Sequence, residues 1–245
     1  PSRTFDGLGA VNFAIAVSPT DGGLAVASTE ARNLLRFEPR LRGHVVDTQM
    51  GFITAAGTKA VVNLNPQTNY AGAGTQAERD SALGIPTGVA YSGDGLRVYV
   101  TSLASDKMGV LDPATGAIVA RVSTLPGPTG VVVDDARGRI YVVGRFRNQL
   151  QTLSTANLTE VARTGIGFDP TPDEIVNGRR FFYGGFTSAH GDQACASCHL
   201  FGDFDNLAWD LGDPGGQFHA APPDMDDPFL SGFDPMKGPM VTQSL

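Results

Sequence analysis

Short apolar runs separated by turn residues dominate the first two thirds of the chain and predict β-strands. Residues 86–91 lead across a polar turn into residues 96–100, and about 42 residues later a closely similar pair recurs at 128–133 and 139–143. Each pair is followed by two weaker strand-like segments. These are residues 108–111 and 117–122 in the first copy and residues 149–153 and 159–162 in the second. Four short strands in a repeat of this length are typical of one β-propeller blade.

An earlier blade is predicted from apolar runs nearer the start of the chain. Its four expected strands are residues 14–17, 24–27, 34–37 and 45–48. A further strand at 61–64 predicts a fourth, interrupted blade, because the Gly-, Ala- and polar-rich residues 65–83 follow it directly. We interpret 65–83 as a surface insertion, which is either a solvated loop or an arm that reaches a partner or the C-terminal part of the chain.

The clearer repeats carry a family resemblance. Residues 98–101 (VYVT), residues 109–112 (GVLD) and the turn that ends in Thr115 and Gly116 resemble the YVTN family of β-propeller repeats. The resemblance covers about residues 10–165 and implies the fold, whereas propellers host many activities. A closed propeller needs at least four blades. We therefore expect further blades before Pro1 or a partner that covers the open edge.

Cys195, Cys198 and His199 have the spacing C-x-x-C-H, which is the attachment motif of c-type haem. Two thiols one turn apart can each add to a vinyl group of the porphyrin, and the adjacent imidazole can bind the iron as proximal ligand. A redox-active dithiol and half of a zinc site are the alternatives. The dithiol lacks its usual βαβ setting, and zinc needs two more ligands, for which His190 and His219 are available.

A Gly- and Pro-containing break separates the strands from the haem motif. We therefore expect β-propeller blades in residues 1–165 and a cytochrome c haem domain in residues 166–245. Thr171 as N-cap, followed by Pro and by Glu174, predicts a helix over residues 172–183. The expected core contacts of this helix are Ile175, Phe181 and Phe182. The predicted fold is mostly β, a partial β-propeller of four-stranded blades, followed by a small α-helical cytochrome c domain.

The C-terminal part has its own resemblance. The stretches that carry it are residues 178–183, 190–194, 201–203 and 238–245. With the haem motif, they resemble the di-haem cytochrome c peroxidase and methylamine-utilisation peroxidase-like superfamily over about residues 170–245, and YVTN propellers fused to such domains recur in bacteria. The resemblance implies a periplasmic or extracellular location and redox partner proteins, including other haem proteins in a complex. The family carries two haem motifs and this sequence one, so a second motif is expected beyond Leu245, and no catalytic residue is assigned.

The sixth ligand of the iron decides the chemistry of such a site. A thioether gives a relatively high-potential electron carrier, whereas an open position permits peroxide chemistry. The candidates are Met225, Met236, Met240, His190 and His219. Met236 and Met240 are favoured because they lie in a Gly/Pro-rich loop after the motif; a ligand outside the chain or none is the remaining alternative. Trp209 is expected either to pack on the haem edge and bind a propionate or to be an ordinary core residue.

Composition narrows the function classes. The chain is 41% hydrophobic and 18% charged, as expected for a folded domain, and it contains no apolar run near the ~20 residues of a transmembrane segment. Its net charge of −7 argues against nucleic acid as a partner. No cysteine remains for a disulfide, because both lie in the haem motif.

An oxygen-rich group follows the haem motif. Its members are Asp203, Asp205, Asn206, Asp210 and Asp213. Calcium is a weaker interpretation of this group than turn formation, because the spacing lacks the EF-hand pattern and its terminal Glu.

These features predict an electron-transfer c-type cytochrome with one covalently attached haem on a propeller scaffold that binds partners. Two alternatives remain open. One is a peroxidase-like oxidoreductase whose second haem lies outside this segment, and the other is an interaction scaffold with a structural haem.

Overall fold

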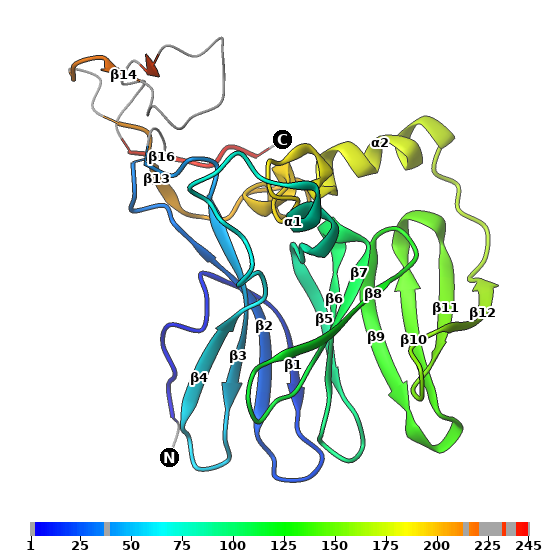
Figure 1. Ribbon diagram of the computed structural model, residues 1–245. Helices are drawn as coiled ribbons and strands as arrows, with labels where there is room; N and C mark the ends of the chain where they lie inside the picture. The colour runs from blue at the N-terminus through cyan, green and yellow to red at the C-terminus, as the bar shows by residue number, and fades with distance from the viewer. Residues whose placement is uncertain (1–2, 37–39, 213–215, 221–231, 234–238, 245) are drawn as a thin grey trace.

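The computed structural model describes residues 3–36, 40–212, 216–220, 232–233 and 239–244. Its larger part consists of three four-stranded antiparallel sheets, here called blades 1, 2 and 3 (Figure 1). Blade 1 contains β1 (Val11–Val17), β2 (Leu24–Ala31), β3 (Val46–Ile53) and β4 (Lys59–Asn63). Blade 2 contains β5 (Pro86–Tyr91), β6 (Val98–Ser102), β7 (Lys107–Leu111) and β8 (Ile118–Ser123). Blade 3 contains β9 (Pro128–Asp134), β10 (Arg139–Gly144), β11 (Gln149–Ser154) and β12 (Glu160–Gly165).

The blades stand side by side in chain order, and the first strand of each blade lies next to the first strand of its neighbour (Figure 1). Apolar side chains fill the spaces between them. Met50 and Val100 belong to the cluster between blades 1 and 2, and Met108 and Ile140 to the cluster between blades 2 and 3. Burial of each such side chain contributes about 1.5–3 kcal/mol. The predicted β fold of four-stranded, propeller-like blades is therefore confirmed.

Local sequence explains the individual strands. Side chains alternate between the two faces of a strand, and in β10 the buried Ile140 and Val142 alternate with half-buried neighbours. The predicted turn between β7 and β8 is also present. The Asp112 N–H donates to the carbonyl of Ala117 at 2.9 Å, and Gly116 adopts the left-handed conformation at φ +73° that the turn requires.

Two expectations for blade 1 are wrong. Residues 34–36 are not a strand, and Leu34 is exposed. The strand predicted at 61–64 does not begin a further blade; as β4 it pairs with β3 and completes blade 1. The described residues therefore contain three blades, not four. The reason is that β3 extends to Ile53, which places β4 after one short turn.

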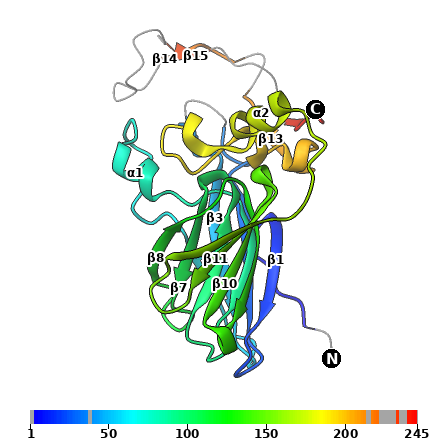
Figure 2. The same ribbon diagram turned by 90° about the vertical axis from the view of Figure 1, so that its right-hand side faces the viewer.

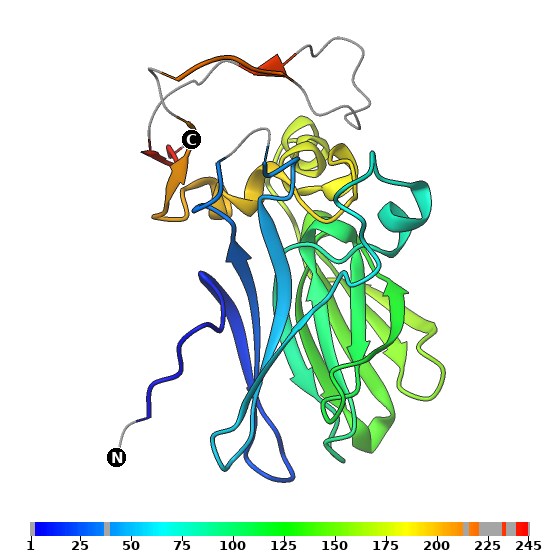
Figure 3. The same ribbon diagram turned by 60° about the vertical axis from the view of Figure 1, so that its left-hand side comes forward.

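The insertion between blades 1 and 2 is partly helical. Its helix α1 (Gln76–Ser81) begins with a capping box, in which Thr75 and Glu78 satisfy each other's backbone N–H groups. The buried Asn65 closes the base of the insertion: its amide donates to the carbonyl of Leu83 at 2.7 Å and accepts from the Leu83 N–H at 2.8 Å. In Figures 1 and 3, α1 lies at the same end of the blades as the chain that follows blade 3.

The chain after blade 3 crosses that end of the blades (Figure 2). It contains α2 (Asp173–Tyr183), the 3-10 turns η4 (Gly185–Thr187), η5 (Cys195–Ser197) and η6 (Leu200–Gly202), and the short strands β13 (Ala208–Asp210), β14 (His219–Ala220), β15 (Gly232–Phe233) and β16 (Pro239–Val241). Over the described part of this region, α2 is the one α-helix, so the structure is less helical than predicted. Asp, Gly and Pro are frequent after the haem motif and favour turns.

Helix α2 ends where predicted but begins one residue later. Pro172 occupies the cap position, and its ring has no atom that could accept a hydrogen bond. The Thr171 hydroxyl, the predicted cap, accepts from Arg179 at 3.1 Å instead. Phe182 packs against the apolar cluster on the blades, whereas Ile175 and Phe181 are exposed. In the described part of the chain, no helix is long and apolar enough to cross a membrane.

Candidate haem attachment site

The three motif residues occupy one tight turn. Cys195 begins η5, and its carbonyl accepts from the N–H of Cys198 at 3.3 Å and of His199 at 3.0 Å. Between the cysteines, Ala196 is buried in a cluster with Leu103 of blade 2 and Phe146 of blade 3. The turn is therefore seated directly on the ends of two blades, and its backbone brings both thiols and the imidazole within one turn of chain.

The two thiols have different environments, and neither forms a disulfide. Cys195 is exposed, whereas Cys198 is half-buried beside Trp209 and Val46. Burial, together with the negative charge of Asp205, raises the pKa of the Cys198 thiol to about 12. A redox-active dithiol requires a lowered thiol pKa. Cys198 therefore lacks the environment of the attacking thiol in such a pair.

The imidazole of His199 has an unsatisfied ring nitrogen. Its Nδ1 atom is buried and has no hydrogen-bond partner among the described residues. The ring of Phe182 in α2 lies beside it, with ring centroids 6.5 Å apart. Buried polar nitrogens are almost always paired, so an unpaired one at this position is consistent with a group that binds from outside the protein.

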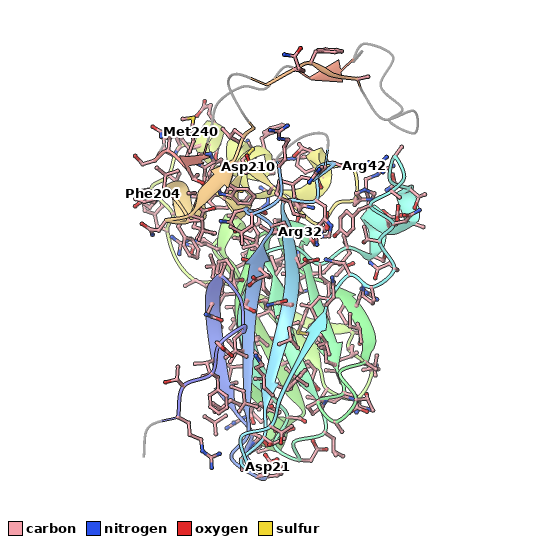
Figure 4. All side chains as sticks on the ribbon, turned by 90° about the vertical axis from the view of Figure 1, so that its left-hand side faces the viewer. Asp21, Arg32, Arg42, Phe204, Asp210 and Met240 are labelled. Atoms are coloured by element: carbon pink, nitrogen blue, oxygen red, sulfur yellow. The ribbon has the colours of Figure 1, made fainter. Side chains whose placement is uncertain are left out.

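A two-stranded ribbon brings one predicted distal ligand to this region. Met240 in β16 lies directly opposite Trp209 in β13, and residues opposite each other in an antiparallel pair project to the same face. Trp209 is buried in the cluster that includes Cys198, and its indole N–H donates to Asp205 at 3.0 Å. Figure 4 shows Met240 and Asp210 at the same end of the molecule, far from Asp21. The structure therefore places Met240 on the Trp209 side of the motif.

The other predicted ligands are not brought together with the motif in the same way. Met225 and Met236 lie outside the described residues. The backbone of His219 belongs to the ribbon β14–β15, which stands away from the blades in Figures 1 to 3. His190 is buried in a separate polar network described below. In the described part of the chain, no three His, Cys, Asp or Glu side chains gather as a metal site.

The acidic residues after the motif stabilise turns. Asp205 accepts from the N–H of Leu207 at 3.0 Å, and Asp210 accepts from the N–H of Gly212 at 2.9 Å. Asp213 lies outside the described residues. These bonds to residues two positions on are the turn chemistry that the sequence favoured over calcium.

A buried polar network ties the insertion to the segment that leads into the haem motif. The hydroxyl of Tyr70 donates to the carboxylate of Asp192, which is three residues before Cys195 and 2% exposed. The Tyr70 ring stacks on His44 with centroids 3.4 Å apart and meets the His190 ring edge-on at 4.9 Å. Burial and the Asp192 charge raise the pKa of Tyr70, so its hydroxyl remains a donor at neutral pH.

Further contacts extend this network. The carboxylate of Glu78 lies 3.6 Å from Nδ1 of the buried His190, and it accepts from the N–H groups of Asn69 and Thr75 at 2.6 Å each. These backbone hydrogen bonds, that of Asn69 foremost, lower the pKa of Glu78 to about 2. The guanidinium of Arg79 donates to the carbonyl of Ala189 at 2.8 Å. Of the two interpretations of residues 65–83, the contact with the C-terminal part is the one the structure shows.

Most of this network was not predicted. The sequence did contain one usable signal, the T-x-x-E spacing of Thr75 and Glu78, which is typical of a helix start. The pairing of Tyr70 with Asp192 had no such signal, because 122 positions separate the two residues.

Comparisons with known proteins support the fold. No protein-family model and no curated protein matches the chain. Hydrazine synthase from Kuenenia stuttgartiensis matches with a TM-score of 0.50 and 20% identity, over 60% of this chain and 46% of that one. The WD40 repeats of RRP9 match with a TM-score of 0.46 and 12% identity, over 66% and 40%. An inactive variant of virginiamycin B lyase from Staphylococcus aureus matches with a TM-score of 0.42 and 15% identity, over 69% and 44%.

These solved structures are β-propellers, and the chain spans less than half the length of each. At this identity the likeness to hydrazine synthase concerns the fold alone. The chain is therefore a β-propeller scaffold with three described blades, on which the C-x-x-C-H turn is seated.

Proposed function

We propose that the chain is an exported electron-transfer c-type cytochrome, with one haem covalently bound through Cys195 and Cys198 and ligated by His199. The observation that carries the proposal is the arrangement of these three residues in the tight turn that begins with η5. Both thiols are free, Cys195 is open to solvent, and the buried Nδ1 of His199 has no partner among the described residues. When bound, the haem supplies a one-electron redox couple.

The chain's own residues have distinct roles in this proposal. Cys195 and Cys198 would bind the porphyrin covalently, and His199 would ligate its iron. Met240 is the proposed distal ligand, because it projects to the same face of the ribbon as Trp209, which packs beside Cys198. The exposed Phe201, held in a left-handed conformation at φ 54°, presents an apolar surface two residues after His199. Redox partner proteins would dock on the blades and on the apolar surface around Phe201.

The test is covalent haem retention after denaturation, following expression with a cytochrome c maturation system. The unchanged chain should keep its haem on a denaturing gel, and the Cys195→Ser, Cys198→Ser double variant should lose it. Ser197→Ala is the matched control, because it lies between the cysteines and leaves all three motif groups in place. Fluorescence of Trp209, the only tryptophan, gives a second readout and should be quenched in the haem-loaded chain. A matured chain without covalent haem would overturn the proposal.

Optical spectra then separate electron transfer from the peroxidase-like alternative. A low-spin spectrum that carbon monoxide does not change supports an electron carrier whose iron has no open coordination position. Met240→Ala should convert this protein to a form that binds carbon monoxide and has a lower reduction potential. A high-spin ferric form of the unchanged chain would refute Met240 as distal ligand and favour a peroxidase-like oxidoreductase.

A further inference from the structure

A cavity of about 800 Å³ lies at the end of blades 2 and 3, and its wall includes Leu103 and Phe146, which also contact the turn of the haem motif. Its walls come from α1, from the loops of blades 2 and 3, and from the face of α2 that carries Val176 and Phe181. Neither motif cysteine nor His199 lines it. Volumes of roughly 300–1,000 Å³ are typical of small-molecule sites. The cavity is therefore large enough for an organic ligand.

Four cations line this cavity against two carboxylates. The cations are Arg79, Lys107, Arg147 and Arg180, and the carboxylates are Asp80 and Asp106. No ion pair within 4.0 Å joins these groups in the described part of the chain. The carboxylates are engaged with other partners: Asp80 accepts from Gln76 at 2.7 Å, and Asp106 accepts from the N–H of Gly127 at 2.8 Å. The cavity thus has an excess of two positive charges in a chain whose net charge is −7.

Two of these cations, Arg180 and Lys107, are held in place by neutral neighbours. The Arg180 guanidinium lies over the rings of Phe186 and Phe181, 4.7 and 5.4 Å from their centroids. The Lys107 ammonium donates to the carbonyl of Ser105 at 3.2 Å. Such contacts position a cation without neutralising it, so its remaining donors are available to an anion.

The remaining wall is apolar. Leu103, Ala104 and Phe146 are buried residues that face the cavity, and Phe186 covers its α2 side. An inorganic anion would leave this apolar surface in contact with water. A ligand with an apolar body and carboxylates would cover the wall and pair with the cations at the same time.

We propose that this cavity binds a small organic dianion, with Arg180 and Lys107 as its principal carboxylate partners. The excess of two positive charges indicates a ligand with two negative charges, and the apolar wall indicates that the rest of the ligand is apolar. The ligand would contact the face of α2 that carries Arg180, so its binding would also hold α2 in place. Phe182, on another face of the same helix, lies beside His199.

Calorimetric titration of the whole chain at low ionic strength tests this with three probes. Terephthalate carries an apolar body and two charges, benzoate carries one charge, and inorganic phosphate carries charge without an apolar body. We expect saturable 1:1 binding in the order terephthalate, benzoate, phosphate. Arg180→Gln and Lys107→Gln should each weaken terephthalate binding about tenfold, as expected for loss of one charge-assisted contact.

Arg97→Gln is the control, because it removes the same charge from the turn between β5 and β6, at the opposite end of blade 2. Unchanged circular dichroism verifies that each variant folds. The proposal is overturned by no heat with any probe, by phosphate binding as tightly as terephthalate, or by Arg97→Gln weakening binding as much as Arg180→Gln. It is also overturned if Arg180→Gln changes haem retention rather than terephthalate binding, since the cavity would then belong to the cofactor.

Discussion

The hydroxyl of Tyr70 offers a direct test of the connection between the insertion and the haem segment. Its hydrogen bond to Asp192 joins two parts of the chain that are 122 positions apart. Tyr70→Phe removes this bond and keeps the ring, so the stacking on His44 remains and no cavity forms. Among the described residues, the Asp192 carboxylate would keep only the distant amide of Gln193, at 3.4 and 3.5 Å.

The expected cost follows from that loss. A hydrogen bond to a charged group contributes about 1.5–3 kcal/mol, and the buried carboxylate has no equivalent donor to replace Tyr70. We therefore expect Tyr70→Phe to lower the free energy of unfolding by about 2 kcal/mol. For a chain of this size, the melting temperature would fall by roughly 4–8 °C.

Urea unfolding measures this change, with Trp209 fluorescence reporting the C-terminal segment and circular dichroism reporting the blades. Tyr91→Phe is the matched control, because Tyr91 is half-buried and its hydroxyl forms no hydrogen bond among the described residues; its effect should stay within about 0.5 kcal/mol. A double-mutant cycle with Asp192→Asn should give a coupling energy of about 1–2 kcal/mol. A Tyr70→Phe variant as stable as the control, with no coupling, would refute the reasoning.

Two further predictions concern the insertion. Asn65→Asp should lower the free energy of unfolding by about 2 kcal/mol, because it places a carboxylate oxygen against the Leu83 carbonyl. Asn157→Asp is the control and should have little effect, because the Asn157 side chain acts only as a hydrogen-bond acceptor. Equal urea midpoints for the two variants would contradict this prediction. Glu78→Gln should be less stable than the unchanged chain above about pH 5, and this difference should shrink as the pH falls from about 4.5 toward 2. The sign follows from a folded-state pKa of about 2, below the ordinary value of 4.5, so the stabilisation is lost on protonation; a difference that stays constant over that pH range would rule it out.

Comparison of the expected and observed elements shows where local sequence was sufficient. The strand pairs of blades 2 and 3 and the turn at Asp112 were predicted correctly, because alternation and turn chemistry act over a few neighbouring residues. Blade 1 was divided wrongly at residues 61–64. Whether a strand completes one sheet or begins the next depends on which edge it pairs with, and a short apolar run does not specify that.

The candidate sites divide along the same line. The C-x-x-C-H spacing at Cys195 is visible in the sequence itself because its residues are consecutive, and its attachment of haem stays a prediction. The pairing of Met240 with Trp209, the bond from Tyr70 to Asp192 and the cationic cavity around Arg180 could not. Each joins segments that are far apart in sequence, and each depends on how loops from different blades meet at one end of the molecule. By itself the sequence determined most of the strands, the turn at Asp112 and the C-x-x-C-H spacing, and only tertiary packing decided which side chains surround that motif.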